Sequence, residues 1–240
     1  SEIISKIWKK ISLTQKKKLY LIANFDLINK QFKRLKSKTP IVKINNIGEK
    51  INTNKLKIIN IPLAFKNPFQ VSLQNARKYI TKSFELAHEL AKDGKAIGLI
   101  NCPINKKLLS KTKTIGVTEF LASKCKVPKG SEVMLIHNKK ISVVPLTTHI
   151  NIKDVSKKIS ISVIMRKMIT LEEYFKKLFF RKPKIGMLGL NPHNAELANN
   201  SEEIKIIIPA ISKLKKRGFN IKGPLPADTL FVNNYNNYDV

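Results

Sequence analysis

The stretch KIGMLGLNPH, residues 184–193, decides the fold of this chain. Its first seven residues form a short run that is apolar after Lys184 and rich in small residues, which predicts a buried strand. Pro192 ends the run, because proline has no N–H for a ladder and biases the residue before it toward extended geometry. His193 is therefore predicted at the carboxyl end of a buried strand, where open α/β sheets bind ligands.

A helix and a second loop are predicted after this strand. Asn200 is a suitable N-cap, Glu203 stands three residues later as in a capping box, and Gly218 is a natural stop. The stretch GPLPADTLF, residues 223–231, then predicts a stiff loop with Asp228 as its one acid. The predicted order of elements is thus a strand that ends near His193, a helix, and a loop that contains Asp228.

Predicted strands and helices alternate along most of the chain, which indicates an α/β protein with a mixed sheet covered by helices on both faces. Residues 132–136 and 141–146 predict a hairpin, and His149 leaves its second strand as His193 leaves the strand at 184–190. Strands are also predicted at 19–25, 41–47, 56–61 and 96–100, and helices at 1–11, 26–35, 71–92, 152–159 and 163–180.

The composition limits the possible classes of protein. A net charge of +30 raises nucleic-acid binding as a candidate. However, the lysines are spread along the chain and no arginine-rich or aromatic reading module accompanies them, so a solvated lysine surface is the favoured interpretation. No apolar run is long enough for a membrane helix, and two cysteines do not form a disulfide framework, so we expect a cytoplasmic protein.

The two quoted stretches resemble the 4-hydroxythreonine-4-phosphate dehydrogenase family of vitamin B6 (pyridoxal phosphate) biosynthesis. Three further motifs fall in the family's order: residues 103–106, residues 116–120, and residues 147–149 with 153–154. The resemblance implies a three-layer α/β/α fold like that of the isocitrate and isopropylmalate dehydrogenases. It also implies a homodimer with the active site at the interface.

The implied reaction is the NAD-dependent oxidation of 4-phosphohydroxy-L-threonine to a β-keto acid, which loses carbon dioxide to give 3-amino-1-hydroxyacetone phosphate. A divalent metal suits this chemistry, because it lowers the pKa of the alcohol that must lose its proton. Zinc, magnesium and cobalt remain open. No Gly-x-Gly-x-x-Gly or phosphate-binding loop is present, so the residues that bind NAD are left unassigned.

The resemblance assigns roles to six residues, and each role has a structural alternative. His149 and His193 are the implied metal ligands, but strand-end histidines can instead bond to backbone. Asp228 is an implied catalytic residue or an Asx-type cap, and Lys106 is catalytic or a solvent lysine. Val117 and Thr118 match the substrate-binding positions, and Thr118 is alternatively a helix cap.

The chain also departs from the family pattern. Val117 stands where the family usually has histidine, and Asn194-Ala195 stand where it has Ala-Gly. The family has a strand before this region and a Tyr-His-Asp-Gln motif after it, which supplies a third metal histidine. We therefore expect residues 1–240 to be a single incomplete dehydrogenase domain that is inactive alone.

Three alternatives to the main function stay open. The first is a sister dehydrogenase that acts on threonate or erythronate 4-phosphate, which the change at Val117 keeps possible. The second is a basic nucleic-acid-binding module, and the third is a degenerate homologue that retains only the fold.

Overall fold

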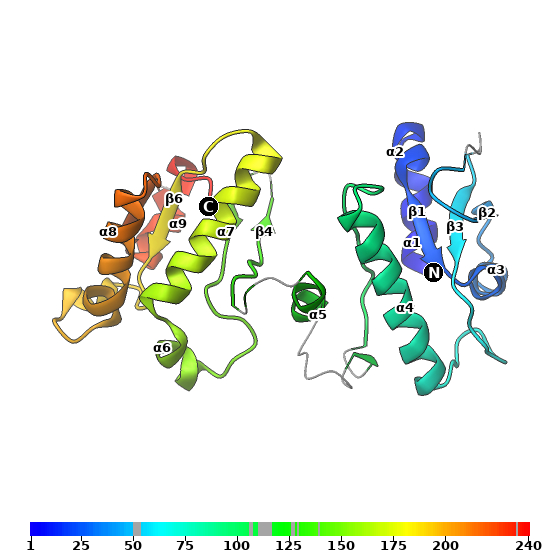
Figure 1. Ribbon diagram of the computed structural model, residues 1–240, viewed down its shortest axis with the longest axis horizontal. Helices are drawn as coiled ribbons and strands as arrows, with labels where there is room; N and C mark the ends of the chain where they lie inside the picture. Colours follow the sequence, from blue (N-terminus) through cyan, green and yellow to red (C-terminus); the bar gives the residue numbers. More distant parts are fainter. Residues whose placement is uncertain are drawn as a thin grey trace. The chain divides into compact units, whose positions relative to one another are not determined.

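The computed structural model describes residues 1–49, 54–105, 108–109, 117–125, 128, 130–138, 140–233 and 235–240. These residues form two compact units, Ser1–Val117 and Thr118–Val240, which are described separately (Figure 1). That both belong to one dehydrogenase domain stays a prediction. Among the described residues, no helix is both long enough and apolar enough to cross a membrane.

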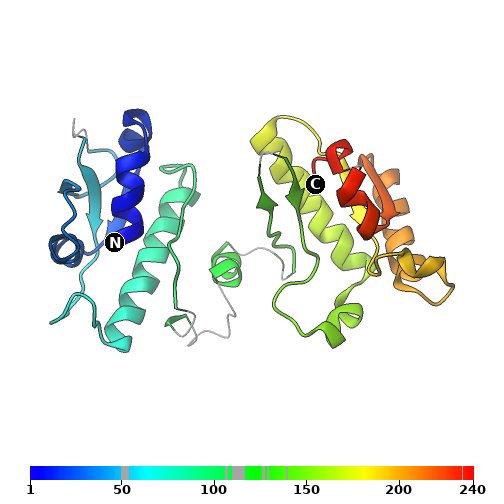
Figure 2. The same ribbon diagram turned by 180° about the vertical axis from the view of Figure 1, so that it is seen from behind.

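The first unit is built on a parallel three-stranded sheet in the order β1–β3–β2, so the predicted strands at 19–25, 41–47 and 56–61 are confirmed. Its strands are β1 (Tyr20–Ala23), β2 (Ile41–Ile44) and β3 (Leu56–Asn60). Its helices are α1 (Glu2–Lys10), α2 (Leu13–Lys18), α3 (Phe25–Arg34) and α4 (Leu73–Lys92). Figures 1 and 2 show α1 and α4 side by side.

The core of the first unit joins these helices to the sheet. Leu56 and Ile58 of the central strand β3 have no exposed surface, and they pack with Trp8 of α1 and Phe32 of α3. Burying an apolar side chain of this size contributes about 1.5–3 kcal/mol relative to leaving it exposed. This core therefore stabilises the first unit through β3.

The second unit contains a parallel pair of strands and an antiparallel pair. The parallel pair is β6 (Ile185–Leu188) with β7 (Ile221–Leu225), and the antiparallel pair is β4 (Ile136–His137) with β5 (Ser142–Val143). The α/β class is confirmed, and the hairpin is shorter than predicted and forms a sheet of its own. The helices are α5 (Val117–Lys124), η2 (Ile152–Asp154), α6 (Val155–Lys158), α7 (Ile161–Phe179), η3 (Asn194–Leu197), η4 (Glu203–Ile207), α8 (Ile208–Lys216), α9 (Ala227–Asn233) and η5 (Tyr235–Asn237).

Helices α7 and α8 cover the β6–β7 pair and position the end of β6. Side chains along β6 alternate between buried and half-buried, as a strand with one covered face requires. Ile185 and Met187 pack with Ile164 of α7 and Leu214 of α8, both of which are fully buried. The polypeptide that follows β6 therefore leaves a rigid, well-packed strand.

Two sequence predictions about packing are wrong. Residues 96–100 form no strand, and the side chains of Ile97 and Ile100 are 110% and 91% exposed. An apolar run becomes a strand only where a neighbouring strand takes its hydrogen bonds, and none of the described strands lies beside it. The helical spacing within 163–180 also predicts that Leu171, Tyr174 and Leu178 face the core. In α7, Leu171 is buried, but Tyr174 and Leu178 are 53% and 66% exposed. Tyr174 lies at the edge of the buried face, and Leu178 lies in the last turn.

Candidate functional site

The strongest candidate site lies where β6 and β7 end together. The two strands are parallel, so their carboxyl ends meet at the same edge of the pair. His193 follows β6, and Asp228 follows β7. The Nε2 atom of His193 lies 3.2 Å from Oδ2 of Asp228, and their side chains are 72% and 40% exposed. The structure thus brings together two of the residues that the sequence singled out, in a position that a solute can reach.

Asp228 does not lie in a stiff loop, as the sequence predicted, but in the first turn of α9. Pro224 lies within β7 rather than after it, and Ala227 begins the helix directly after the strand. The N–H of Ala227 donates a 3.0 Å hydrogen bond to the carbonyl of Pro192, which ties α9 to the residue before His193. The prediction failed because a proline is tolerated inside an edge strand such as β7, so two prolines do not require a loop.

Glu203 holds the loop that carries His193. Its side chain has no exposed surface, and its Oε1 atom accepts the backbone N–H groups of Leu190 at 2.8 Å and Asn191 at 3.0 Å. The capping box predicted from Asn200 and Glu203 is wrong, because the Ser201 hydroxyl accepts the N–H of Ile204 instead. The carboxylate of Glu203 instead reaches the end of β6, where its Oε1 atom accepts the two loop N–H groups.

The charge state of Glu203 follows from these contacts. Burial alone would raise its pKa. Hydrogen bonds from the N–H groups of Asn191 and Leu190 and from the Ser201 hydroxyl outweigh burial, so the pKa of Glu203 lies below its ordinary value. The carboxylate is therefore ionised near neutral pH, and charge-assisted hydrogen bonds of this kind are about twice as strong as neutral ones.

Sequence analysis missed the role of Glu203, although a signal for it was present. Glu203 precedes Ile207, Ile211 and Leu214 at helical spacing, so it falls on the apolar face of the helical segment. An acid on such a face must find a buried partner, and the end of the preceding strand is the nearest one in sequence.

A left-handed turn follows His193. Asn194, Ala195, Glu196 and Leu197 have φ angles of 56°, 48°, 49° and 55°. Side chains other than glycine pay about 1–2 kcal/mol per residue in this conformation. Buried Asn194 helps to hold the turn, because its Nδ2 donates to the carbonyl of Pro224 at 3.3 Å. Gly189 lies beneath it, and a Cβ there would stand 2.1 Å from Oδ1 of Asn194.

The other predicted site residues are not joined to the His193–Asp228 pair. His149 is exposed, with a φ of 55°, and no hydrogen bond or ion pair among the described residues connects it to the pair. Val117 is half-buried at the start of α5, and Thr118 is exposed at the second position of that helix. Lys106 lies outside the described residues. The roles predicted for these residues stay predictions.

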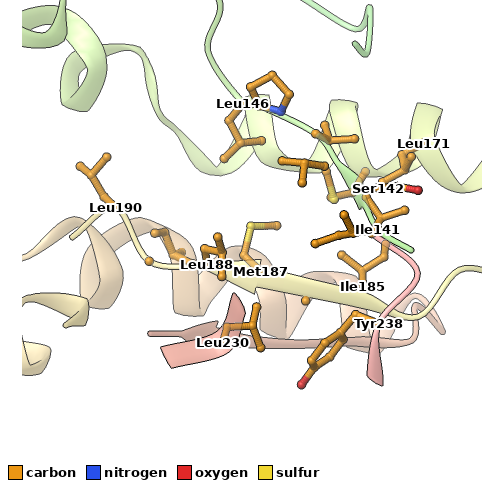
Figure 3. A pocket seen from close by; sticks show the side chains of 18 of the residues that line it. Ile141, Ser142, Leu146, Leu171, Ile185, Met187, Leu188, Leu190, Leu230 and Tyr238 are labelled. Atoms are coloured by element: carbon orange, nitrogen blue, oxygen red, sulfur yellow. The ribbon is translucent and has the colours of Figure 1, made fainter. Parts of the chain in front are cut away.

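A cavity of about 310 Å³ lies elsewhere in the second unit. Figure 3 shows it between β6, where Ile185, Met187 and Leu188 are labelled, and the segment that carries Ile141 and Leu146. Its lining is mainly apolar and includes neither His193 nor Asp228. No charged side chain of the described residues lines the cavity, so it offers a phosphorylated substrate no ionic contact, although Leu190 and Leu230 of its lining belong to the segments that carry His193 and Asp228.

The donor atoms at the candidate site fit part of a metal centre. An imidazole whose one ring nitrogen is held by a carboxylate can offer the other nitrogen to a metal. Asp228 contacts Nε2 of His193, and no described residue bonds to Nδ1. The described part of the chain contains no cluster of three His, Cys, Asp or Glu side chains that could hold a metal ion. The pair therefore has one free imidazole nitrogen and a carboxylate that can orient the ring, and further ligands would have to come from elsewhere.

Comparisons with known proteins identify the family. The model of the family described as "Pyridoxal phosphate biosynthetic protein PdxA" matches residues 15–240. The chain belongs to this family. The match contains His193, Asp228 and Glu203, so the candidate site lies within the family's own sequence region. The resemblance noted in the two quoted stretches is thereby confirmed.

Individual relatives extend this result. A 4-hydroxythreonine-4-phosphate dehydrogenase of Erythrobacter litoralis is 36% identical over 158 residues, which cover 64% of this chain and 47% of that protein. A D-threonate 4-phosphate dehydrogenase of Cupriavidus necator is 36% identical over 151 residues, which cover 61% of this chain and 45% of that protein. This PdxA-family chain spans about half the length of the curated relatives it matches.

A solved structure supports the fold. The crystal structure of a 4-hydroxythreonine-4-phosphate dehydrogenase from Burkholderia phymatum matches with a TM-score of 0.82 at 29% identity. The match covers 96% of this chain and 71% of that chain. The α/β arrangement described above is therefore that of a PdxA-family dehydrogenase.

Proposed function

We propose that this chain is part of an NAD-dependent and metal-dependent 4-hydroxythreonine-4-phosphate dehydrogenase. The enzyme oxidises 4-phosphohydroxy-L-threonine to a β-keto acid, which decarboxylates to 3-amino-1-hydroxyacetone phosphate in pyridoxal phosphate biosynthesis. The observation that carries the proposal is the 3.2 Å contact between His193 and Asp228 at the shared end of two parallel strands, in a chain of the PdxA family.

The proposed roles follow from the geometry. His193 would hold the metal, with His149 as a second ligand by resemblance, and Asp228 orients the His193 imidazole through Nε2. A divalent metal held there would supply the Lewis acidity for loss of the hydroxyl proton, and NAD would be the hydride acceptor. Asp228 is 40% exposed, so its carboxylate can also take up a proton close to the substrate. The lysine-rich surface attracts the phosphorylated substrate.

The test is an absorbance assay for NADH formation with the product of the complete reading frame. Reduction that depends on 4-phosphohydroxy-L-threonine, is stopped by a chelator and is lost in His193→Ala supports the proposal. A matched His137→Gln variant changes an exposed histidine that bonds to Ser142, and it is expected to keep full activity. Reduction that survives both the chelator and His193→Ala would exclude the proposed metal role.

A second substrate class is favoured by one relative and one residue. The Cupriavidus necator protein is named as a D-threonate 4-phosphate dehydrogenase. Val117 stands where the family usually has a histidine, so one predicted polar contact to the substrate is lost, and the two substrates differ in one polar group, an amine in one and a hydroxyl in the other. Activity on threonate or erythronate 4-phosphate, without activity on 4-phosphohydroxy-L-threonine, would establish this alternative.

A further inference from the structure

The loop between β6 and His193 has backbone N–H groups whose hydrogen bonds lie outside the β6–β7 ladder. β7 pairs with β6 as far as Leu188, and the N–H of Gly189 donates to the carbonyl of Leu225 at 3.2 Å. The next two N–H groups, those of Leu190 and Asn191, both donate to Glu203. Beyond the end of the β-ladder, one carboxylate oxygen of Glu203 therefore accepts the N–H groups that a neighbouring strand would otherwise accept.

We infer that Glu203 is the positioning residue of the His193–Asp228 pair. Its carboxylate fixes the two residues before Pro192 from the side of η4. On the other side, the N–H of Ala227 fixes the carbonyl of Pro192 at 3.0 Å. The loop is thus held between the buried glutamate and the first residue of α9, and this hold sets the position of His193 next to Asp228. The catalytic meaning of this role rests on the proposed function, but the role itself does not.

The surroundings of Glu203 leave the carboxylate little freedom to move. Glu203 has no exposed surface, and a Cβ on Gly189 would lie 3.1 Å from its Oε1 atom. The second oxygen, Oε2, is buried without a hydrogen-bond partner among the described residues. Burying a carboxylate is costly unless hydrogen bonds replace those to water, and the two N–H groups of the loop provide such bonds. Helix capping does not account for the two bonds to the loop, because the Ser201 hydroxyl accepts the N–H of Ile204.

The first test measures amide hydrogen exchange at Leu190 and Asn191 by NMR. Glu203→Ala removes the shared acceptor, so we expect these two amides to exchange about 10- to 100-fold faster, as loss of a charge-assisted hydrogen bond implies. Glu203→Gln keeps one carbonyl oxygen in the same place and should restore most of the protection. Glu202→Gln is the matched control, because this neighbouring acid accepts neither N–H, and its exchange should equal that of the parent.

A second measurement separates positioning from general stability. The contact between His193 and Asp228 can be followed through the side-chain NMR resonances of His193. At fixed pH, Asp228→Asn should shift these resonances. The response should fall by at least about half in a Glu203→Ala background and persist in a Glu203→Gln background, since coupled residues show non-additive effects. Unchanged exchange at Leu190 and Asn191, or an unchanged response of His193 in Glu203→Ala, overturns the inference.

Two further outcomes are distinguishable. If Glu203→Ala does not fold, Glu203→Asp is the variant that tests the inference. It keeps the negative charge, but its side chain is shorter by one methylene group, so the oxygen lies farther from the two N–H groups. Faster exchange at the two amides in Glu203→Asp supports the inference, and parental exchange overturns it. If the complete product lacks dehydrogenase activity while Glu203→Ala still releases the loop, the proposed function fails and the positioning role of Glu203 stands.

Discussion

Nε2 of His193 lies 3.2 Å from Oδ2 of Asp228, although a strand, a helix and a left-handed turn separate the two residues in the chain. The contact exists because β6 and β7 are parallel and end at the same edge, so that each delivers one side chain. A carboxylate held against an exposed imidazole fixes the orientation of the ring.

Replacing Asp228 with asparagine is predicted to weaken the enzyme without unfolding it. Both side chains are solvent-accessible, so the fold loses little, whereas loss of an orienting carboxylate typically costs about 10- to 100-fold in metal affinity or activity. The measurement is kcat/KM for NAD reduction by the complete product, alongside isothermal titration with cobalt. His137→Gln serves as the control and should leave both quantities unchanged. Parental kcat/KM and cobalt affinity in Asp228→Asn would contradict the prediction.

Gly189→Ala is predicted to destabilise the second unit. The added Cβ would stand 2.1 Å from Oδ1 of Asn194, a buried atom that can move away only by disturbing the turn after His193. Overpacking of this kind costs about 1–3 kcal/mol. Urea denaturation gives the change in the free energy of unfolding. Gly98→Ala is the matched control, because nothing lies within 4 Å of a Cβ there, and equal values for both variants would refute the prediction.

Ala195→Gly is predicted to stabilise the protein. Ala195 has a φ of 48°, which glycine adopts without steric cost, so we expect a gain of about 1 kcal/mol, reduced by the greater backbone freedom of glycine in the unfolded chain. Ala198→Gly is the matched control, because its φ of −59° suits alanine and the change should destabilise. Denaturant midpoints of the two variants should therefore move in opposite directions, and movement in the same direction would contradict the prediction.

Acid is predicted to weaken the second unit partly through Asp239. The hydrogen bond from the Arg181 guanidinium is the largest cause that holds the pKa of Asp239 below its ordinary value, and the N–H of Lys184 adds to it at 2.8 Å. Because the folded pKa is lower than the unfolded one, the stabilisation is full above the unfolded pKa and is lost as pH falls through the folded pKa.

The measurement is the free energy of unfolding as a function of pH, at and below about pH 4, where an unfolded aspartate titrates. Asp239→Asn should lower stability at neutral pH and make the decline in acid shallower. Glu173→Gln is the control, because Glu173 forms an exposed pair with Lys177 on α7, and its decline should resemble that of the parent. An acid decline in Asp239→Asn as steep as in the parent would exclude this role.

Local patterns predicted most of the elements that carry the site. The apolar run before Pro192 became β6, and Gly218, with a φ of 80°, ends the helical segment as predicted. These features depend on neighbours in sequence: proline lacks an N–H, and glycine tolerates positive φ. The same reasoning failed for residues 96–100, because a strand also needs a partner that no local pattern names.

The sequence alone determined the family, the strand that ends before His193 and the two residues of the candidate pair. Motifs and periodicity depend only on residues that are close together in the chain, so they can be read without the structure. Only the tertiary structure decided that Asp228 belongs to a helix, that His193 and Asp228 touch, and that Glu203 anchors the loop instead of capping a helix. Each of these features depends on hydrogen bonds between groups that are distant in the chain. Packing decides which of these groups meet, because buried polar groups must find partners once water is excluded.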